Sequence, residues 1–369
     1  MQNFNKNKRT KWIILGIIAA ILIAGIFKVN SDLSPVAKGK SDTFVIEEGE
    51  SFDSVLEHLE KEGFIKSAFV TKYYSKFFGS GKYYAGYFEL KDTMSTSEIL
   101  EFISNQSNAK AETVTLTFPE GKWAKEIAEI LAENFDYTKE EILEKWNDID
   151  YIKELAKDYE FLDVKVLNNK EYNVKLEGYL FPNTYQFDKN ADLDTITRTF
   201  LDQFKIVYDQ YKEKIEKSDL SLHEIITFAS IVQFESGSAD EMKTVAGVFY
   251  NRMDKGMRLG SSVTVCYALY DEFESAEDCE TNAEIDSPYN TYLHTGLPIG
   301  PILNPGKDAI EAVLEPEDND YLYFVADIYH KKDGKMHFSK TYEEHEKWID
   351  ELGLNLDNSE ETDEEETES

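Results

Sequence analysis

The pattern of apolar positions begins with one uninterrupted run, residues 12–27, that contains no charged side chain. Four basic residues precede it between positions 6 and 11, and Lys28 closes it. A helix of these 16 residues spans about 24 Å, and lysine side chains at its ends extend to the bilayer surface. We therefore predict a single-pass transmembrane helix over 12–28, with the basic residues 1–11 in the cytoplasm and the rest of the chain outside the cell membrane. The alternative is a cleaved signal peptide, which the length of the run disfavours.

After a polar linker over residues 29–42, the apolar positions alternate between strand and helix periods. We predict strands over 43–46 and 84–90, separated by helices over 52–62 and 67–78. Ser95 and Glu98 form a capping box that begins a further helix. Residues 43–110 are therefore predicted to fold as a small α+β subdomain.

The opening of that subdomain recurs 72 residues later. A predicted strand over 114–118 is followed by Glu120, Gly121 and a helical pattern, just as the first strand is followed by Glu48, Gly49 and a helix. Equal spacing of strand, turn and helix indicates two copies of one β-turn-α unit. The alternative is a chance similarity between two common local patterns.

The rest of the chain also mixes both periods, which gives an α+β fold class for a larger domain over 111–352. Helical patterns cover 122–157, 192–217 and 239–253, and Ser221 with Glu224 caps another helix that continues to position 235. Segment 256–307 is rich in glycine and proline and is predicted to be mostly irregular, which is typical of functional loops. A core strand over 321–325 and a last helix from Tyr342 complete the pattern.

Charge excludes one class of partner. The chain carries 72 acidic and 39 basic residues, for a net charge of −33, whereas nucleic-acid binding needs a basic surface. Part of the excess lies in residues 358–369, which are nearly all acidic, serine or threonine. Segment 353–369 is predicted to be a disordered acidic tail.

The two cysteines, Cys266 and Cys279, lie 13 positions apart. In an exported protein they can form a disulfide, which would stabilise the fold by about 3 kcal/mol through closing a short loop. Two unpaired thiols are the alternative, because the sequence does not show how close their Cα atoms lie. Two cysteines without a neighbouring histidine make a poor metal site, and the sequence predicts neither metal nor cofactor.

The candidate for chemistry is Glu235. On the capped helix it shares a stripe with Phe228, Ile231 and Val232. Burial disfavours the charged form of a carboxyl and raises its pKa, and a carboxyl that keeps its proton near neutral pH acts as a general acid. The alternative is that the helix ends here and Glu235 is solvated.

Seven segments in order make this chain resemble the MltG/YceG-like endolytic murein transglycosylases. The resemblance covers roughly residues 43–350, and its amino-terminal anchor and LysM-like subdomain over 43–110 match the family's arrangement. The segments are 176–185, 229–236, 251–252, 287–292, 296–302, 304–306 and 337–341.

The resemblance implies cleavage of peptidoglycan glycan strands between MurNAc and GlcNAc, with a 1,6-anhydroMurNAc end as product. One carboxyl suffices for this reaction, first as the acid for the leaving oxygen and then as the base for the 6-hydroxyl of MurNAc. Ordinary glycosidases need a second carboxylate. The resemblance also implies a role in limiting strand length during wall growth, alongside wall synthesis or division proteins.

Glu235 matches the family's catalytic glutamate, and Gln233 stands where the family commonly has a second one. Glu177 is expected to be structural or substrate-positioning, with a helix or strand cap as the alternative. Ser262, Asn290 and Tyr292 are candidates for the sugar-binding cleft. For Tyr289 and Tyr292 the alternative is that they anchor the loop on the core. For His337, a candidate substrate contact, the alternative is a structural histidine.

One motif departs from the family. Where relatives usually show Gln-Ser-Asp-Pro-Thr-Val, this chain has Gly-Ser-Ser-Val-Thr-Val over residues 260–265, so an acidic residue is missing. This departure motivates an alternative function as a glycan-binding scaffold without activity. A glycoside hydrolase that uses Glu235 with a distant carboxylate and a water is the third hypothesis, and product chemistry distinguishes it.

Overall fold

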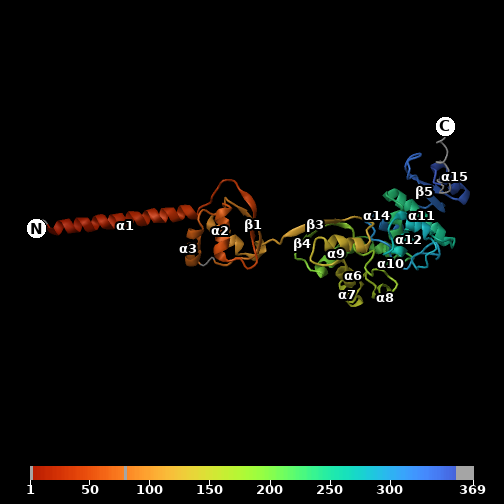
Figure 1. Cartoon of the computed structure of the whole chain (residues 1–369), viewed down its shortest axis with the longest axis horizontal. Helices are drawn as coiled ribbons and strands as arrows, with labels where there is room; N and C mark the ends of the chain where they lie inside the picture. Colours follow the sequence, from red (N-terminus) through yellow and green to blue (C-terminus); the bar gives the residue numbers. More distant parts are fainter. Residues whose placement is uncertain (1–2, 79–80, 355–369) are drawn as a thin grey trace, which may run out of the picture. The chain divides into compact units, whose positions relative to one another are not determined.

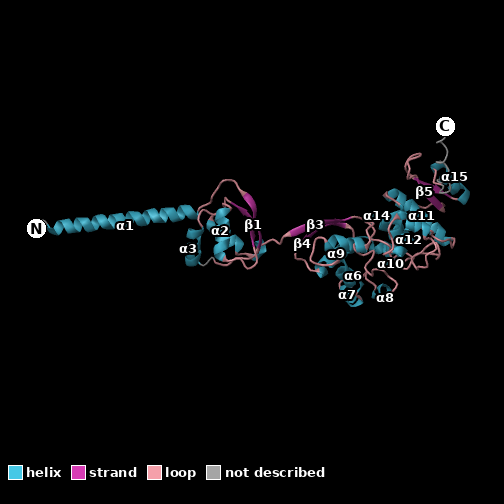
Figure 2. Cartoon of the chain, in the orientation of Figure 1, coloured by secondary structure: helices cyan, strands magenta, loops and turns pink. Residues whose placement is uncertain are grey.

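The computed structural model describes residues 3–78 and 81–354, and the chain divides between Thr113 and Val114 into two units (Figures 1 and 2). Both combine helices with two-stranded sheets. Most of the predicted acidic tail lies outside the described residues.

The first helix, α1 (Asn3–Leu33), contains a segment from Lys11 to Leu33 that is long and apolar enough to cross a membrane, with a mean hydropathy of 2.5. It extends five residues beyond the predicted end at Lys28, so the first part of the predicted linker is helical. An ion pair between Lys28 and Asp32, one turn apart at 2.8 Å, lies on this extension.

The rest of the first unit forms a small α+β fold. Strand β1 pairs antiparallel with β2, with Phe44 opposite Phe88, and both rings are buried with side chains of α2 and α4. The capping box of Ser95 and Glu98 is present at the start of α4. The elements are β1 (Ser41–Ile46), α2 (Phe52–Lys61), α3 (Ala68–Phe78), β2 (Gly86–Lys91), α4 (Thr96–Ile103) and η1 (Gln106–Asn108).

The β-turn-α similarity extends to three dimensions. Strand β3 (Thr113–Phe118) and helix α5 (Ala124–Ala132) each begin 72 residues after β1 and α2. Gly49 and Gly121 adopt the same left-handed backbone conformation, with φ of 79° and 82°, which glycine reaches without steric cost. The second copy closes its sheet with a more distant strand, β4 (Asn183–Asp188).

The segment 122–157, predicted to be helical, contains three helices: α5, α6 (Lys139–Asn147) and α7 (Ile149–Leu155). Thr138 and Asp148 divide it, because each accepts a hydrogen bond from a backbone N–H at the start of the next helix. A short helix α8 (Val164–Leu167) follows, and α9 (Leu193–Ile215) lies within the predicted 192–217.

The C-terminal part surrounds helix α10 (Leu222–Glu235), which begins at the predicted capping box of Ser221 and Glu224. It packs against α11 (Ala239–Asp254), α12 (Ser262–Leu269) and α14 (Lys307–Leu314). Segment 256–307, predicted to be mostly irregular, thus contains α12 and the short α13 (Ala276–Thr281).

The chain ends in a small α+β layer. Strand β5 (Tyr323–Ala326) pairs antiparallel with β6 (Met336–Ser339), and α15 (Tyr342–Leu352) contacts both. The residues of β5 are all half-buried, so the predicted core strand is a half-buried strand of a two-stranded sheet.

Candidate active site

Glu235 is the last residue of α10, on a helix whose preceding side chains Ile231 and Val232 are fully buried. Its carboxyl oxygen Oε1 accepts a hydrogen bond from the Ser261 hydroxyl at 2.5 Å. Burial raises the pKa of Glu235, and the bond from Ser261 and the charge of Arg252 oppose this shift. The C-terminal end of a helix is also electrically negative, which further disfavours an ionised carboxyl there.

Arg252 brings a buried positive charge from α11 to the site. Its guanidinium donates hydrogen bonds to the carbonyl oxygens of Leu322, at 2.6 Å, and of Leu259. It also lies over the ring of Tyr323, 5.3 Å from the centroid. Because burial does not deprotonate an arginine, this group can stabilise the ionised form of Glu235 whenever that form arises.

The turn that carries Ser261 is held by two buried threonines. The backbone N–H of Ser261 donates to the Thr291 hydroxyl at 3.0 Å, and the Thr264 hydroxyl donates to the Ser261 carbonyl at 2.7 Å. The two threonine hydroxyls lie 2.9 Å apart. The Ser261 hydroxyl therefore reaches Glu235 from a fixed backbone, 26 positions away in sequence.

Gly260 has no side chain, and this leaves space beside Arg252 and Tyr292. A Cβ atom there would lie 3.7 Å from the Tyr292 ring and 3.8 Å from a guanidinium nitrogen of Arg252. Gly260 adopts a φ of 60°, in which side chains are strained. Tyr292 remains 36% exposed, and its pKa is raised by burial and by the negative charge of Glu235. The site is thus bordered by Glu235, Ser261, Arg252 and Tyr292.

Gln233, two residues before Glu235, has a structural role. Its side-chain oxygen accepts a hydrogen bond at 2.8 Å from the backbone N–H of Gly306, which caps α14. Because position 233 carries an amide, Glu235 is the acid at this end of α10.

Two of the predicted substrate-binding residues are enclosed. Asn290 is 0% exposed, and its side-chain nitrogen donates to the carbonyl oxygens of Ala283 and Ile285 while its oxygen accepts from the N–H of Tyr292. The structure does not support Asn290 as a sugar contact, because its amide anchors the loop. Tyr289 is likewise buried, with its ring 4.9 Å from that of Tyr267.

Glu177 is the second enclosed residue, and it caps a helix. Its carboxylate accepts hydrogen bonds from the N–H of Ala124 at the start of α5, from the side-chain amide of Asn304 at 2.7 Å and from the hydroxyl of Tyr267 at 3.0 Å. Burial raises its pKa to about 8 against these bonds, which lower it. The cap alternative is therefore favoured over a substrate contact.

Ser262 and Tyr292 fit the predicted sugar-binding cleft better than Asn290 and Glu177, because both are partly exposed. Ser262 is half-buried at the first position of α12, directly after Ser261. The sequence prediction missed Ser261 and Arg252 as partners of Glu235. The signals available for them were the departing 260–265 motif and the pair Asn251 and Arg252.

The structure joins Cys266 and Cys279 in a disulfide, with their Cα atoms 4.7 Å apart. This bond ties α12 to α13 directly behind Ser261 and Ser262. It therefore restricts the movement of α12, which follows Ser261 in the chain.

His337 packs in the C-terminal layer, with its ring 4.0 Å from that of Trp348 and its Nε2 atom 3.2 Å from Asp333. Asp327, Asp333 and His337 place atoms that could bind a metal ion within 4.8 Å of one another. However, the Asp327 carboxylate accepts hydrogen bonds from four consecutive backbone N–H groups, at 331–334. The cluster is thus explained as the closure of the β5–β6 turn.

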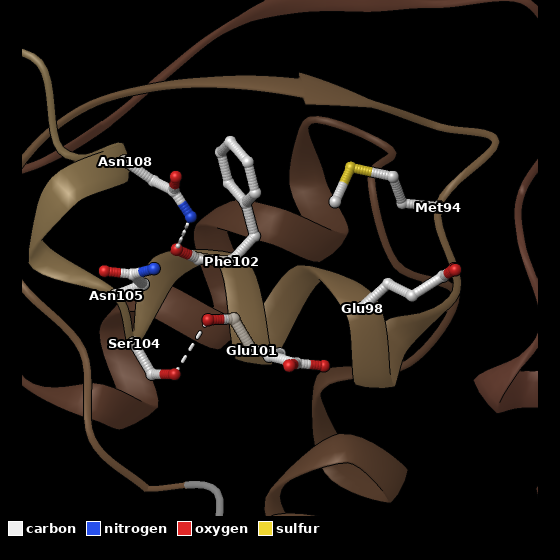
Figure 3. Close-up of a pocket in the computed structure, with 7 residues that line it drawn as sticks. All are labelled: Met94, Glu98, Glu101, Phe102, Ser104, Asn105 and Asn108. Atoms are coloured by element: carbon white, nitrogen blue, oxygen red, sulfur yellow. Dashed lines mark hydrogen bonds between the residues drawn. The ribbon is translucent and has the colours of Figure 1, made fainter.

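A hollow of about 450 Å³ lies in the other unit, lined by α4 and the residues that follow it (Figure 3). Its polar groups bond within the chain: Asn108 donates to the Phe102 carbonyl, Ser104 donates to the Glu101 carbonyl, and Glu98 caps Ser95. The pKa of Glu98 is lowered by its hydrogen bonds from Ser95, opposite to the shift of Glu235, so we place the chemistry at α10.

Comparison with known proteins identifies the family of this chain. Residues 44–351 match the YceG-like family. The chain is 34% identical over 331 residues to an endolytic murein transglycosylase of Bacillus subtilis, covering 89% of this chain and 90% of that protein. A Streptococcus pneumoniae protein of the same name is 30% identical, with 91% of this chain and 63% of that longer protein covered.

The fold comparison is consistent as well. A crystal structure of a yceG-like protein from Listeria monocytogenes aligns with a TM-score of 0.58 at 33% identity, over 83% of this chain and 98% of that one. The matches in sequence extend over both units and include α10, α11 and α12. The chain therefore belongs to the YceG-like family.

Proposed function

We propose that this protein is an endolytic peptidoglycan lytic transglycosylase that cleaves the MurNAc–GlcNAc bond within glycan strands and leaves 1,6-anhydroMurNAc ends. The observation that carries this proposal is one half-buried carboxyl, Glu235, whose raised pKa coexists with a positioned hydroxyl and a nearby guanidinium. Two relatives named endolytic murein transglycosylase support it.

In the first step, protonated Glu235 donates its proton to the glycosidic oxygen. The C1–O bond then breaks, its electron pair stays on the leaving oxygen, and positive charge develops at C1. Burial and the helix C-terminus keep the proton on Glu235 until substrate is bound. The carboxylate that results is stabilised by Ser261 and Arg252.

In the second step, the Glu235 carboxylate accepts the proton of the MurNAc 6-hydroxyl. The oxygen of that hydroxyl forms the new bond to C1. The acid is thereby regenerated, and no water is consumed. Glu235 performs both proton transfers, because the carboxylate that remains after it donates the first proton is the base that accepts the second.

The surroundings of Glu235 favour this scheme over hydrolysis. Inverting and retaining glycosidases need a second carboxylate near the bond. The partners that act on the Glu235 carboxyl are the Ser261 hydroxyl and the Arg252 guanidinium, which suit a single group that serves as acid and then as base. The neighbouring Gln233 is bonded to Gly306.

Mass spectrometry of the products tests the proposal. Uncrosslinked glycan strands are incubated with the full chain in detergent, and the new ends are identified. Fragments with anhydro ends, one water lighter than hydrolytic products, are expected. Ordinary reducing ends would instead identify a hydrolase. Intact strands with a folded protein that still binds glycan would favour the scaffold alternative.

Removal of the Ser261 hydroxyl is predicted to change the pH dependence of cleavage. Glu235 must be protonated to act, and its pKa is raised, so the rate is highest on the acid side and falls as pH rises through that pKa. The Ser261 bond favours the ionised form; Ser261→Ala is therefore expected to move the fall to higher pH and to lower the maximal rate about tenfold. Rate–pH profiles of the parent, Ser261→Ala and the hydroxyl-retaining Ser261→Thr check this. An unchanged profile in Ser261→Ala would exclude a positioning role.

We further propose that α1 anchors the protein in the cell membrane with the basic N-terminus in the cytoplasm, which its apolar segment and flanking charges support. The first unit beyond α1 is proposed to be a LysM-like subdomain. Cleavage of nascent strands beside the membrane would limit their length and would place the protein near wall synthesis or division proteins.

A further inference from the structure

Helix α3 has the reverse of the side-chain distribution expected for a surface helix. Its buried positions are the small residues Ala68, Thr71 and Ser75. Large aromatic side chains project outward instead, and their exposed fractions are 70% at Phe69, 48% at Tyr73, 82% at Phe77 and 71% at Phe78. Helices of soluble proteins bury such residues, whereas helices in lipid pack through small residues and expose large ones.

Three of these aromatic residues form one continuous stripe. Phe69, Tyr73 and Phe77 follow one another at intervals of four positions, so they share a face, and the first two rings lie 4.9 Å apart. Lys76 lies beside them, with its ammonium 5.8 Å from the centre of the Tyr73 ring, whereas Lys72 forms an ion pair with Asp53 of α2. The helix contains no acidic residue, in a chain whose net charge is −33.

The position of α3 relates the stripe to the apolar helix. Just before α3, the Lys66 ammonium donates hydrogen bonds to the Ser31 carbonyl at 3.2 Å and to the Ser34 hydroxyl at 2.8 Å. Helices α1 and α3 are in contact, and Figure 1 shows α3 beside the end of α1. Ser31 lies three residues, or about 4.5 Å of helix, beyond Lys28, the residue that closes the apolar run.

We propose that the face formed by Phe69, Tyr73 and Phe77 lies in the interface of the same bilayer that α1 crosses, with Lys76 facing anionic phospholipid headgroups. Aromatic side chains are favoured at this depth, and basic side chains gain from the negative surface potential. The proposal rests on the membrane anchorage proposed above. A second contact of this kind fixes the orientation of the first unit at the membrane surface, which a single spanning helix does not.

Fluorescent labels in the full chain test the proposal. Because Cys266 and Cys279 are paired, an added cysteine is the one reduced thiol available for labelling. The test position is Phe77→Cys, whose parent side chain packs little. Thr43→Cys is the matched control, since Thr43 is exposed on β1, which Figure 1 draws on the far side of this unit from α3. Leu22→Cys, within α1, reports on the anchor itself.

Each variant carries an environment-sensitive fluorophore and is reconstituted in vesicles of phosphatidylglycerol and phosphatidylethanolamine, with spin-labelled lipids as shallow or deep quenchers. The label at position 77 is expected to be blue-shifted and quenched by the shallow lipid several-fold more than the label at 43. The label at position 22 is expected to respond to the deep quencher.

Three outcomes would overturn the proposal, and they differ in meaning. If positions 77 and 43 are equally solvent-exposed while 22 is quenched, the anchor stands and the interfacial contact is excluded. If 22 is not quenched, the anchorage itself fails, and the contact with it. A blue shift at 77 without lipid quenching would show that protein, such as a second copy of the chain, covers the stripe.

Discussion

Replacement of Glu235 by glutamine is expected to lower the rate of glycan-strand cleavage by about 1,000-fold. Glutamine has neither the proton that the leaving oxygen needs nor the basicity that the 6-hydroxyl needs, so both steps fail. The measurement is the rate of appearance of new strand ends under single-turnover conditions. The loss should appear in kcat rather than in KM, because the amide occupies the same volume.

The fold should tolerate this substitution. The glutamine oxygen still accepts the hydrogen bond from Ser261, and the change removes a carboxyl whose ionisation burial already disfavours. The unfolding midpoint is therefore expected to stay unchanged or to rise. Glu284→Gln is the matched control, since Glu284 is exposed in the loop before Asn290. Cleavage by Glu235→Gln at the parent rate would remove Glu235 from the mechanism.

Replacement of Glu177 by alanine is expected to lower the free energy of unfolding by about 4 kcal/mol. The change leaves the N–H of Ala124, the amide of Asn304 and the hydroxyl of Tyr267 without their shared acceptor in a closed interior. Denaturant unfolding followed by tryptophan fluorescence measures the loss, since Trp123 adjoins the capped residue. Glu177→Gln keeps one acceptor oxygen and should lose less.

A pH series separates this structural role from a substrate contact. The pKa of Glu177 is about 8 in the folded protein against an ordinary 4.5, so the folded state holds the proton more tightly between these values. The unfolding free energy should therefore fall as pH rises through that range, and Glu177→Ala should weaken this dependence. An effect on KM with unchanged stability would instead indicate that Glu177 contacts the sugar.

Much of the local structure follows from the sequence. The apolar run predicts α1, and the capping boxes at Ser95 and Ser221 predict the starts of α4 and α10. The 72-residue spacing predicts two matching strand–turn–helix units, which the structure contains. These features are determined by residues within a few positions of one another, because helix and strand periods and caps act over a single turn.

The family was also readable from the sequence, which is 34% identical over 331 residues to a curated relative. By contrast, the helix ends within 122–157 were not placed from the sequence, because the helical pattern continues across Thr138 and Asp148 while their side chains start new helices. Competition between a continued helix and a new cap depends on how the flanking segments pack.

The environment of Glu235 and the role of each neighbour were decided only by the tertiary structure. Ser261 reaches Glu235 across 26 positions, and Asn304 reaches Glu177 across 127. The same packing buries Asn290 and pairs Cys266 with Cys279. The sequence alone therefore determined which elements form and which acid is available. The folded chain decided which groups surround that acid, because contacts at such separations depend on the paths of the intervening loops and not on local spacing.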